Sequence, residues 1–151
     1  MTVRVRRFRD GDARKASDMI RKTQREVNSR YYSRSVIERL CKTMTPGKMK
    51  EYSEERIFYV AVDGEKIVGT VTLAEDNHIG TLFVHPRYHN MGVGRKLMEK
   101  IEEVARKRGV KRMRLSAAVN AVGFYKRIGY KHPRKFKDKC CSTVYKMSKK
   151  L

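Results

Sequence analysis

Two glycines that stand two residues apart, Gly92 and Gly94, interrupt a basic segment that continues with helical periodicity. Main-chain NH groups at the start of a helix have no partners within the helix, and the helix dipole adds partial positive charge there. Glycine lets the backbone come close to a bound anion, and Arg95 and Lys96 follow directly. These residue types at this spacing favour a site for a phosphate or pyrophosphate group.

Spacing excludes two familiar phosphate-binding sequences. The dinucleotide pattern G-x-G-x-x-G would need a third glycine at Leu97, and a P-loop would need Gly-Lys-Ser/Thr where this chain has Gly94-Arg95-Lys96. A pyrophosphate site remains. A turn that only precedes a helix is the alternative, and the spacing leaves it open.

The composition predicts one packed domain over residues 1–151, because the 151-residue chain is 40% hydrophobic. No apolar run approaches the ~20 residues that cross a membrane, and no secretory signal is recognisable, so we expect a cytoplasmic protein without membrane association. Cys41, Cys140 and Cys141 match neither a disulfide framework nor metal-ligand spacing. We therefore expect reduced thiols and no metal.

The formal net charge of +21 is unevenly distributed along the chain. Residues 1–56 carry 16 Lys and Arg against 8 Asp and Glu, residues 57–110 carry 8 against 7, and residues 111–151 carry 13 against 1. Such a surface attracts polyanions without specificity and repels cationic small molecules.

The elements that must position the glycine loop follow a mixed order of strands and helices. Strands are expected at 3–8, on both sides of the Asp63-Gly64 turn within 56–73, and at 78–84, 111–117, 130–136 and 141–147. Helices are expected after the turn at 10–12, from Ser33 or Ser35, from the glycine loop to Gly109, and at 121–129. We expect the segment from Thr45 to Glu55 to be a loop, because Pro46 and Gly47 break the periodicity.

Two segments of the second half resemble the GNAT superfamily of acyl-CoA-dependent N-acyltransferases. In that family a strand ends in V-x-P, Q/R-x-x-G-x-G/A opens a helix, and a later A-x-x-F/L-Y-x-x-x-G-F/Y carries the catalytic tyrosine. This chain has Val84-His85-Pro86, then residues 89–94, then residues 121–130 in register. The resemblance covers residues 57–133. It implies a single-domain α/β (α+β) GNAT-like fold with a central mixed, mostly antiparallel sheet of about six to seven strands and about four helices.

The resemblance also implies an acetyl-CoA site in which main-chain amides hold the pyrophosphate, with CoA as product. The residues that it assigns to this site are Leu82, Phe83, Val84, His89, Asn90, Met91, Gly92, Val93, Gly94, Arg95, Lys96, Asn120 and Phe124. The chain departs from the family at two positions. His89 replaces the usual Gln or Arg, and Ala118 stands where an Asn often contacts CoA, with Asn120 close by but out of register.

The implied reaction is transfer of an acetyl group from acetyl-CoA to a primary amine by direct attack in a ternary complex. Tyr125 is the candidate acid, since a phenol with a pKa near 10 stays protonated and can donate to a thiolate whose conjugate pKa is about 8.5. By itself a tyrosine at this position also fits a core aromatic. Amides of Phe83 and Val84 would stabilise the oxyanion at a split between the fourth and fifth strands, which the resemblance implies.

The base that removes the proton of the amine is not fixed by the sequence. His78 begins the strand at 78–84, where it is expected to share a face with Gly80 and Leu82, and a neutral imidazole there could relay the proton. Glu75 and Glu55 are alternatives. Attack by an already neutral amine, with water carrying the proton away, needs no base residue.

The acceptor is constrained mainly by charge. Tyr31, Tyr32 and the segment 45–55 are candidate walls of the acceptor site, and the regions that would carry it are strongly basic. Polyamines and aminoglycosides are therefore disfavoured. We expect an acidic small molecule, or an amine on an anionic or nucleic-acid-bound partner. Monomer and homodimer both remain open.

Two other functions compete with this interpretation. One is a basic nucleic-acid-binding module that uses residues 131–139 together with Tyr130 and Phe136. The other is a GNAT-like protein that binds acyl-CoA without catalysing transfer.

Overall fold

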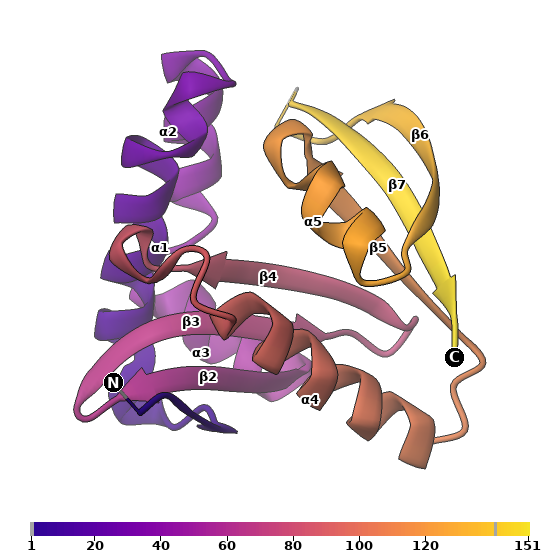
Figure 1. Cartoon of the computed structure of the whole chain (residues 1–151). Coiled ribbons are helices and arrows are strands. Elements are labelled where there is room, and N and C mark those ends of the chain that lie inside the picture. The colour runs from indigo at the N-terminus through magenta and orange to yellow at the C-terminus, as the bar shows by residue number, and fades with distance from the viewer. Residues whose placement is uncertain (1, 141) are drawn as a thin grey trace.

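The strands and helices follow the expected order, with one helix more than expected (Figure 1). The computed structural model describes residues 2–140 and 142–151. The strands are β1 (Arg4–Arg7), β2 (Ile57–Asp63), β3 (Lys66–Leu73), β4 (His78–Val84), β5 (Arg112–Ala118), β6 (Lys131–Lys137) and β7 (Thr143–Lys150). The α-helices are α1 (Ala13–Glu26), α2 (Arg34–Lys42), α3 (Pro46–Glu55), α4 (Val93–Lys107) and α5 (Val122–Arg127). Short 3-10 helices are η1 (Asp10–Asp12), η2 (Asn28–Arg30), η3 (Pro86–Tyr88) and η4 (Val119–Ala121).

The seven strands form one mixed sheet in the order β1-β2-β3-β4-β5-β7-β6. Neighbouring strands pair antiparallel except for β4 and β5, which are parallel. This confirms the expected mixed, mostly antiparallel sheet of six to seven strands. The β2–β3 hairpin turns at Asp63-Gly64 as expected, because Gly64 has a φ of 62° and Asp63 pairs with Lys66.

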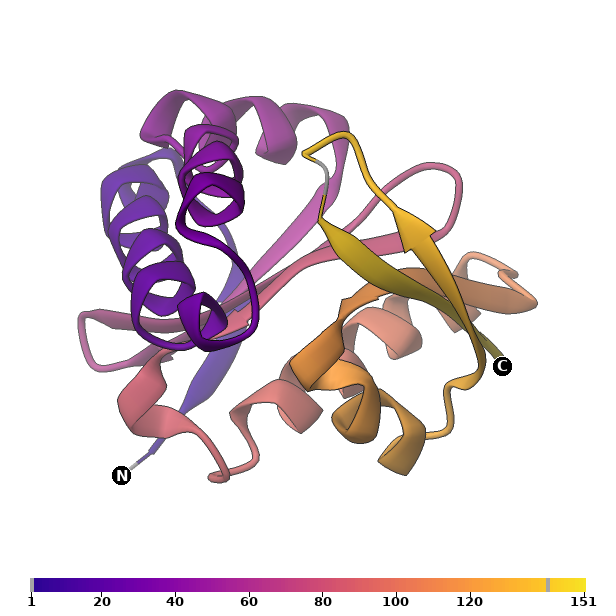
Figure 2. The same cartoon turned by 90° about the horizontal axis from the view of Figure 1, so that it is seen from above.

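Different helices cover the two faces of the sheet (Figure 2). Helices α1 and α3 pack on one face, against Phe58, Val60 and Val62 of β2. Helix α4 packs on the other face through Val93, Leu97, Met98 and Ile101, together with residues of β3 and β5. Gly109, with a φ of 78°, follows the end of α4 as expected. Across the described ranges, no helix combines the length and the apolar character that spanning a bilayer requires.

The expected loop at 45–55 is wrong, since these residues belong to α3 and its N-cap. The Thr45 hydroxyl accepts a hydrogen bond from the Lys48 amide at 3.2 Å, and Pro46 occupies the first turn, where its missing NH costs nothing. Met49 is fully buried, and the Tyr52 hydroxyl donates to the Thr43 carbonyl at 2.9 Å. Pro46 and Gly47 would break a helix in its interior, but after Thr45 they stand at the start of α3.

Candidate active site

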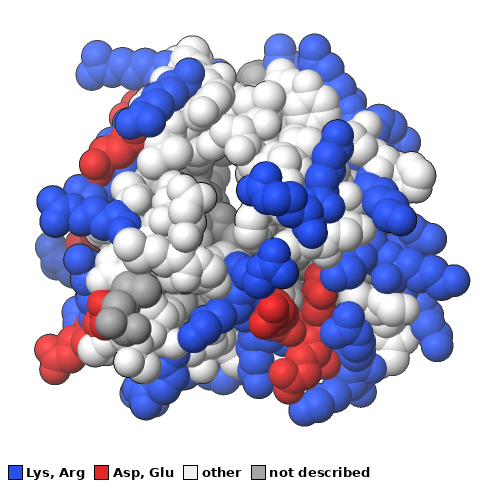
Figure 3. All heavy atoms as spheres, in the orientation of Figure 1, with Lys and Arg blue, Asp and Glu red and all other residues white. Residues whose placement is uncertain are grey.

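The sheet splits between β4 and β5. The two strands pair only through His78 with Arg114 and Ile79 with Leu115, although β4 continues to Val84. Beyond Ile79 the main chain of β4 therefore has an edge that β5 does not cover. In Figure 3 the surface is hollowed between the α1 side and the α5 side of the molecule, and Lys and Arg side chains stand along the border toward α5.

A β-bulge interrupts β4 at the split, which sequence reasoning did not anticipate. Thr81 has a φ of 52°, a conformation that is rare for a β-branched residue. The register with β3 shifts there, and the Thr70 hydroxyl donates to the Thr81 carbonyl at 2.6 Å. The extra residue turns Leu82 to the α4 face of the sheet, where it packs on the core, so the expectation that Leu82 shares a face with His78 is wrong.

The backbone beyond the bulge presents one amide to the split and turns the other away. The His85 amide donates to the Val68 carbonyl of β3 at 2.9 Å. Backbone groups alternate along a strand, so the Phe83 amide points toward β3 as well, and the Val84 amide points toward the open edge. The Phe83 side chain packs with the α1 and α3 cluster. At the open edge, the His89 ring donates from Nε2 to the Val84 carbonyl at 2.8 Å.

The glycine loop forms a left-handed turn at the start of α4. Asn90 and Gly92 have φ values of 62° and 82°, and the Lys96 amide makes the first hydrogen bond of the helix, to the Gly92 carbonyl at 3.0 Å. Amides 93–95 therefore precede the first bonded turn. Met91, Arg95 and Lys96 are exposed, and the Lys96 ammonium donates to the Val3 carbonyl at 3.0 Å beside β1.

The second glycine has a packing role. A Cβ at Gly94 would lie 3.2 Å from the Phe124 ring and 3.6 Å from Val84. Gly94 thus lets α5 approach the first turn of α4 and the end of β4. This contact brings the loop, the open edge of β4 and the helix that carries Tyr125 together. By contrast, a Cβ at Gly92 would meet nothing within 4 Å.

Tyr125 is buried on α5, with an exposed fraction of 7%. Its ring contacts those of Phe124 and Tyr130 edge to face, at centroid distances of 5.2 and 5.9 Å. Among the described residues no hydrogen bond reaches its hydroxyl. Burial raises the pKa of Tyr125 well above the ordinary value of 10, so the phenol stays protonated.

Tyr130 is a core residue, so the hypothesis that it forms part of a nucleic-acid-binding surface is wrong. Only 1% of the residue is exposed, and its hydroxyl donates to Glu102 Oε2 at 2.8 Å. The Lys149 ammonium donates to the other oxygen of Glu102 at 3.0 Å. Phe136 is 45% exposed, as that hypothesis requires, but the Lys146 ammonium lies 3.7 Å from its ring centroid.

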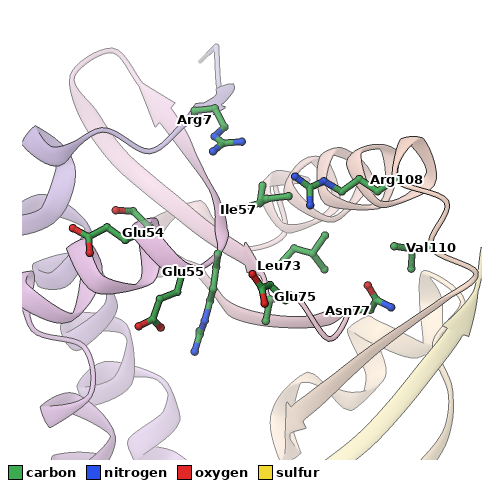
Figure 4. A pocket seen from close by; sticks show the side chains of 12 residues that line it. Arg7, Glu54, Glu55, Ile57, Leu73, Glu75, Asn77, Arg108 and Val110 are labelled. Atoms are coloured by element: carbon green, nitrogen blue, oxygen red, sulfur yellow. The ribbon is translucent and has the colours of Figure 1, made fainter.

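The candidate bases lie in two places. His78 lies beside Arg114 at the closed end of the split, and its Nδ1 is 3.1 Å from Asp76 Oδ2. Glu55 and Glu75 border a separate pocket of about 450 Å³ (Figure 4). Arg108 and Val110 also line that pocket, so it lies at the C-terminal end of α4, away from Gly92.

Residues between α1 and α2 are hydrogen-bonded to the C-terminal half of the chain. The Tyr32 hydroxyl accepts from the Val119 amide at 2.9 Å and donates to the Thr143 carbonyl at 2.5 Å, while Tyr31 is exposed. The Asn120 side chain donates to Asn28 Oδ1 at 3.1 Å, so this amide is engaged with η2.

His85 was not among the site residues expected from the sequence, although it lies between Val84 and Pro86, just before the turn η3 that leads to the glycine loop. Only 7% of the residue is exposed, and its Nδ1 accepts from the Arg87 amide at 3.1 Å. Burial, and then the nearby charges of Lys66 and Lys22, lower its pKa from 6.5. The sequence signal for this role is a histidine directly before Pro86, where its side chain can cap the following turn.

Cys41 and Cys140 do not cluster with other ligand residues among the described residues. Cys41 is buried on α2, Cys140 is half-buried, and Cys141 lies outside the described residues. Within ranges 2–140 and 142–151, no three His, Cys, Asp or Glu side chains are grouped as metal ligands.

Comparison with known proteins identifies similar sequences and folds. A family model described as an acetyltransferase (GNAT) domain matches residues 24–151. A GCN5-related N-acetyltransferase from Rhodopseudomonas palustris has a similar structure, with a TM-score of 0.90 and 23% identity over 100% of this chain and 97% of that one. PaiA N-acetyltransferase from Thermoplasma acidophilum, solved in complex with coenzyme A, gives 0.82 and 21% over 100% of both chains. Ard1 from Thermoplasma volcanium gives 0.73 and 21% over 100% and 99%.

Proposed function

Because this chain belongs to the GNAT acetyltransferase family and is an acyltransferase, we propose that it transfers an acetyl group from acetyl-CoA to a primary amine. The amine attacks the thioester directly, within a ternary complex. One observation carries the proposal. The turn at Gly92, the open edge of β4 and the helix that carries the buried Tyr125 meet around the contact between Gly94 and Phe124.

The residues around the split fit an acyl-CoA. Amides 93–95 at the start of α4, with exposed Arg95 beside them, suit the pyrophosphate. The Val84 amide and carbonyl at the uncovered edge of β4 suit an extended chain that carries amides of its own. His89 already donates to that carbonyl, which has a second lone pair to offer. Acetyl-CoA supplies the activated acyl group, and its thiol leaves.

The mechanism that we propose uses the open edge and Tyr125. The amine nitrogen forms a bond to the acyl carbon, and the Val84 amide donates to the oxygen that becomes negative. The carbon–sulfur bond then breaks, and Tyr125 gives its proton to the sulfur. A buried phenol with a raised pKa is protonated at neutral pH and has no protein acceptor for that proton within the described residues.

For removal of the proton from the amine we propose His78. Donation from Nδ1 to Asp76 would leave the lone pair of Nε2 available as a base, and its pairing with Arg114 places it at the closed end of the split. Glu55 and Glu75 border another pocket, which makes them weaker candidates.

Calorimetric titration with acetyl-CoA tests the proposal, at about 0.3 M salt so that plain electrostatics is partly screened. 3′-Dephospho-CoA and ATP serve as comparison ligands. The informative variant is Gly92→Ala, and Gly64→Ala is its matched control. Both glycines have positive φ and nothing within 4 Å of an added Cβ, but Gly64 lies in the β2–β3 turn.

We expect micromolar binding that is selective for acetyl-CoA, weakened by Gly92→Ala and unchanged by Gly64→Ala. Equal binding of all three ligands, or equal effects of the two substitutions, would mean that the loop only starts a helix. Any binding would then follow from the positive charge of the protein.

A further inference from the structure

The sheet face formed by β5, β7 and β6 opposite α4 and α5 is basic and uncovered. We call it the basic face and define it by Arg112, Arg114, Arg134, Lys146 and Lys150. The registers place these residues on one side, because Lys146 pairs with Ser116 and Arg134, and Arg112 pairs with Lys150. Their neighbours Met113 and Leu115 point to the other side and are buried in the core.

The cations of the basic face lack carboxylate partners. Within the described residues, the one ion pair made by residues 111–151 joins Lys149, on the opposite side of β7, to Glu102. The single acidic residue there, Asp138, accepts from Ser142 in its own turn. Elsewhere some cations are paired, as in Arg6 with Asp12 and Arg25 with Glu38. The basic face thus presents a row of cations that no carboxylate of the described residues neutralises.

This face begins at the proposed reaction centre. Arg114 pairs with His78 where β4 and β5 separate, and Arg56 NH1 lies 3.8 Å from where a Cβ of Gly80 would be. From Arg114 the cations continue across β7 to Arg134 on the edge strand β6. At about 4.8 Å between strands, the row extends roughly 10 Å from the split.

An acceptor for such a row needs several negative charges over that length and a primary amine at one end. A nucleic acid supplies the charges but no aliphatic amine. The face also lacks free stacking platforms, because Lys146 covers Phe136 and Tyr130 is buried. A polypeptide with Asp and Glu near its amine supplies both.

Resting on the proposed acetyl transfer, we infer that the acceptor is a primary amine of an acidic polypeptide segment, whose carboxylates bind the basic face from Arg114 to Arg134. The amine then reaches the split beside His78 and Gly80.

Binding of fluorescent peptides, followed by anisotropy, tests the inference without relying on activity. One peptide carries Asp and Glu in the residues after its amine, and its partner carries Asn and Gln. A single-stranded oligonucleotide of matched charge is the third probe. The variant Arg134→Gln/Lys146→Gln removes two charges from the basic face. Its matched control, Lys135→Gln/Lys137→Gln, removes two charges from the other side of β6, since Lys135 pairs with Tyr145.

We expect the acidic peptide to bind wild-type protein more tightly than its amide partner, and about tenfold more weakly after loss of Arg134 and Lys146, because two exposed ion pairs are removed. The control variant should bind within about twofold of wild type. CoA release with the two peptides should follow the same order in kcat/KM.

Equal affinity for the two peptides in wild-type protein would overturn the inference, and that comparison needs no variant to fold. Equal losses in the two variants would do the same. Tighter binding of the oligonucleotide, lost with Arg134 and Lys146, would assign the face to nucleic acid instead. Failure of acetyl-CoA to bind in calorimetry would refute the proposed activity separately.

Discussion

Replacing Tyr125 by phenylalanine separates a chemical role of its hydroxyl from a structural one. The Tyr125 residue is buried and its hydroxyl has no hydrogen-bond partner among the described residues, so removal of the hydroxyl deletes no protein hydrogen bond. Because no protein hydrogen bond is lost, the substitution is expected to change the free energy of unfolding by less than about 1 kcal/mol. For a chain of this size that corresponds to a shift in Tm of no more than about 4 °C.

The same change is expected to slow catalysis strongly. A positioned acid contributes about 10²–10⁴ in rate, so a loss of at least about 100-fold in kcat is expected, which is roughly 2.7 kcal/mol at 1.36 kcal/mol per factor of ten. Acetyl-CoA affinity should change by less than about threefold. The assays are release of CoA thiol under saturating substrates and calorimetry on the same preparation.

Tyr130→Phe is the matched control, because the rings of Tyr125 and Tyr130 are in contact and each substitution removes one phenol oxygen. Tyr130 donates to Glu102, so its substitution should cost about 1.5–3 kcal/mol of stability, as expected for a bond to a charged group, with a small effect on kcat at 25 °C. The reasoning is refuted if Tyr125→Phe lowers the Tm as much as Tyr130→Phe does, or if it retains more than half of the wild-type kcat.

Three further changes probe the loop, the unexpected helix and the buried histidine. Gly92→Ala should cost about 1–2 kcal/mol of stability through its left-handed φ, whereas Gly92→Asn should cost less, and urea titration of both variants checks this. Thr45→Ala should cost about 1 kcal/mol through loss of the α3 N-cap, and Thr45→Ser should restore most of it; an unchanged urea midpoint for the alanine variant would contradict the cap. His85 has a folded-state pKa below its unfolded value, so its contribution to stability is present above pH 6.5 and is lost as the pH falls; the Tm of His85→Gln should therefore vary less between pH 5 and 7 than that of wild type.

Much of the fold could be predicted from local sequence, because hydrophobic alternation and turn residues act over short distances. The hairpin at Asp63-Gly64, the strand at 78–84 and the helix that ends before Gly109 are examples. The sequence does not predict helix α3 by periodicity, because Pro46 and Gly47 break a helix in its interior, but the same residues directly after Thr45 fit the start of a helix. The helix-breaking residues and the N-cap are both local features, and the position of Thr45 before Pro46 and Gly47 makes them the start of a helix.

The site was less accessible from sequence, because its geometry depends on contacts between distant segments. Nothing in the sequence around Thr81 marks a bulge, which depends on the hydroxyl of Thr70 in the neighbouring strand. That single inserted residue decides that Leu82 faces α4. Likewise, Gly94 fitted a ligand-binding glycine by its spacing, but its close contact with Phe124 depends on where α5 docks.

The two halves of the sheet are held at both ends of the split, and this arrangement gives the candidate site its width. At the closed end, β4 and β5 share two residue pairs. At the other end, Tyr32 joins Val119 and Thr143, and burial raises its pKa so that its hydroxyl remains a donor. A residue that fixes the width acts on every acceptor alike, whereas the basic face outside the split distinguishes among acceptors by charge. The proposed acceptor surface adjoins the proposed reaction centre at Arg114 and His78, whereas Arg134 and Lys146 lie on β6 and β7, away from it.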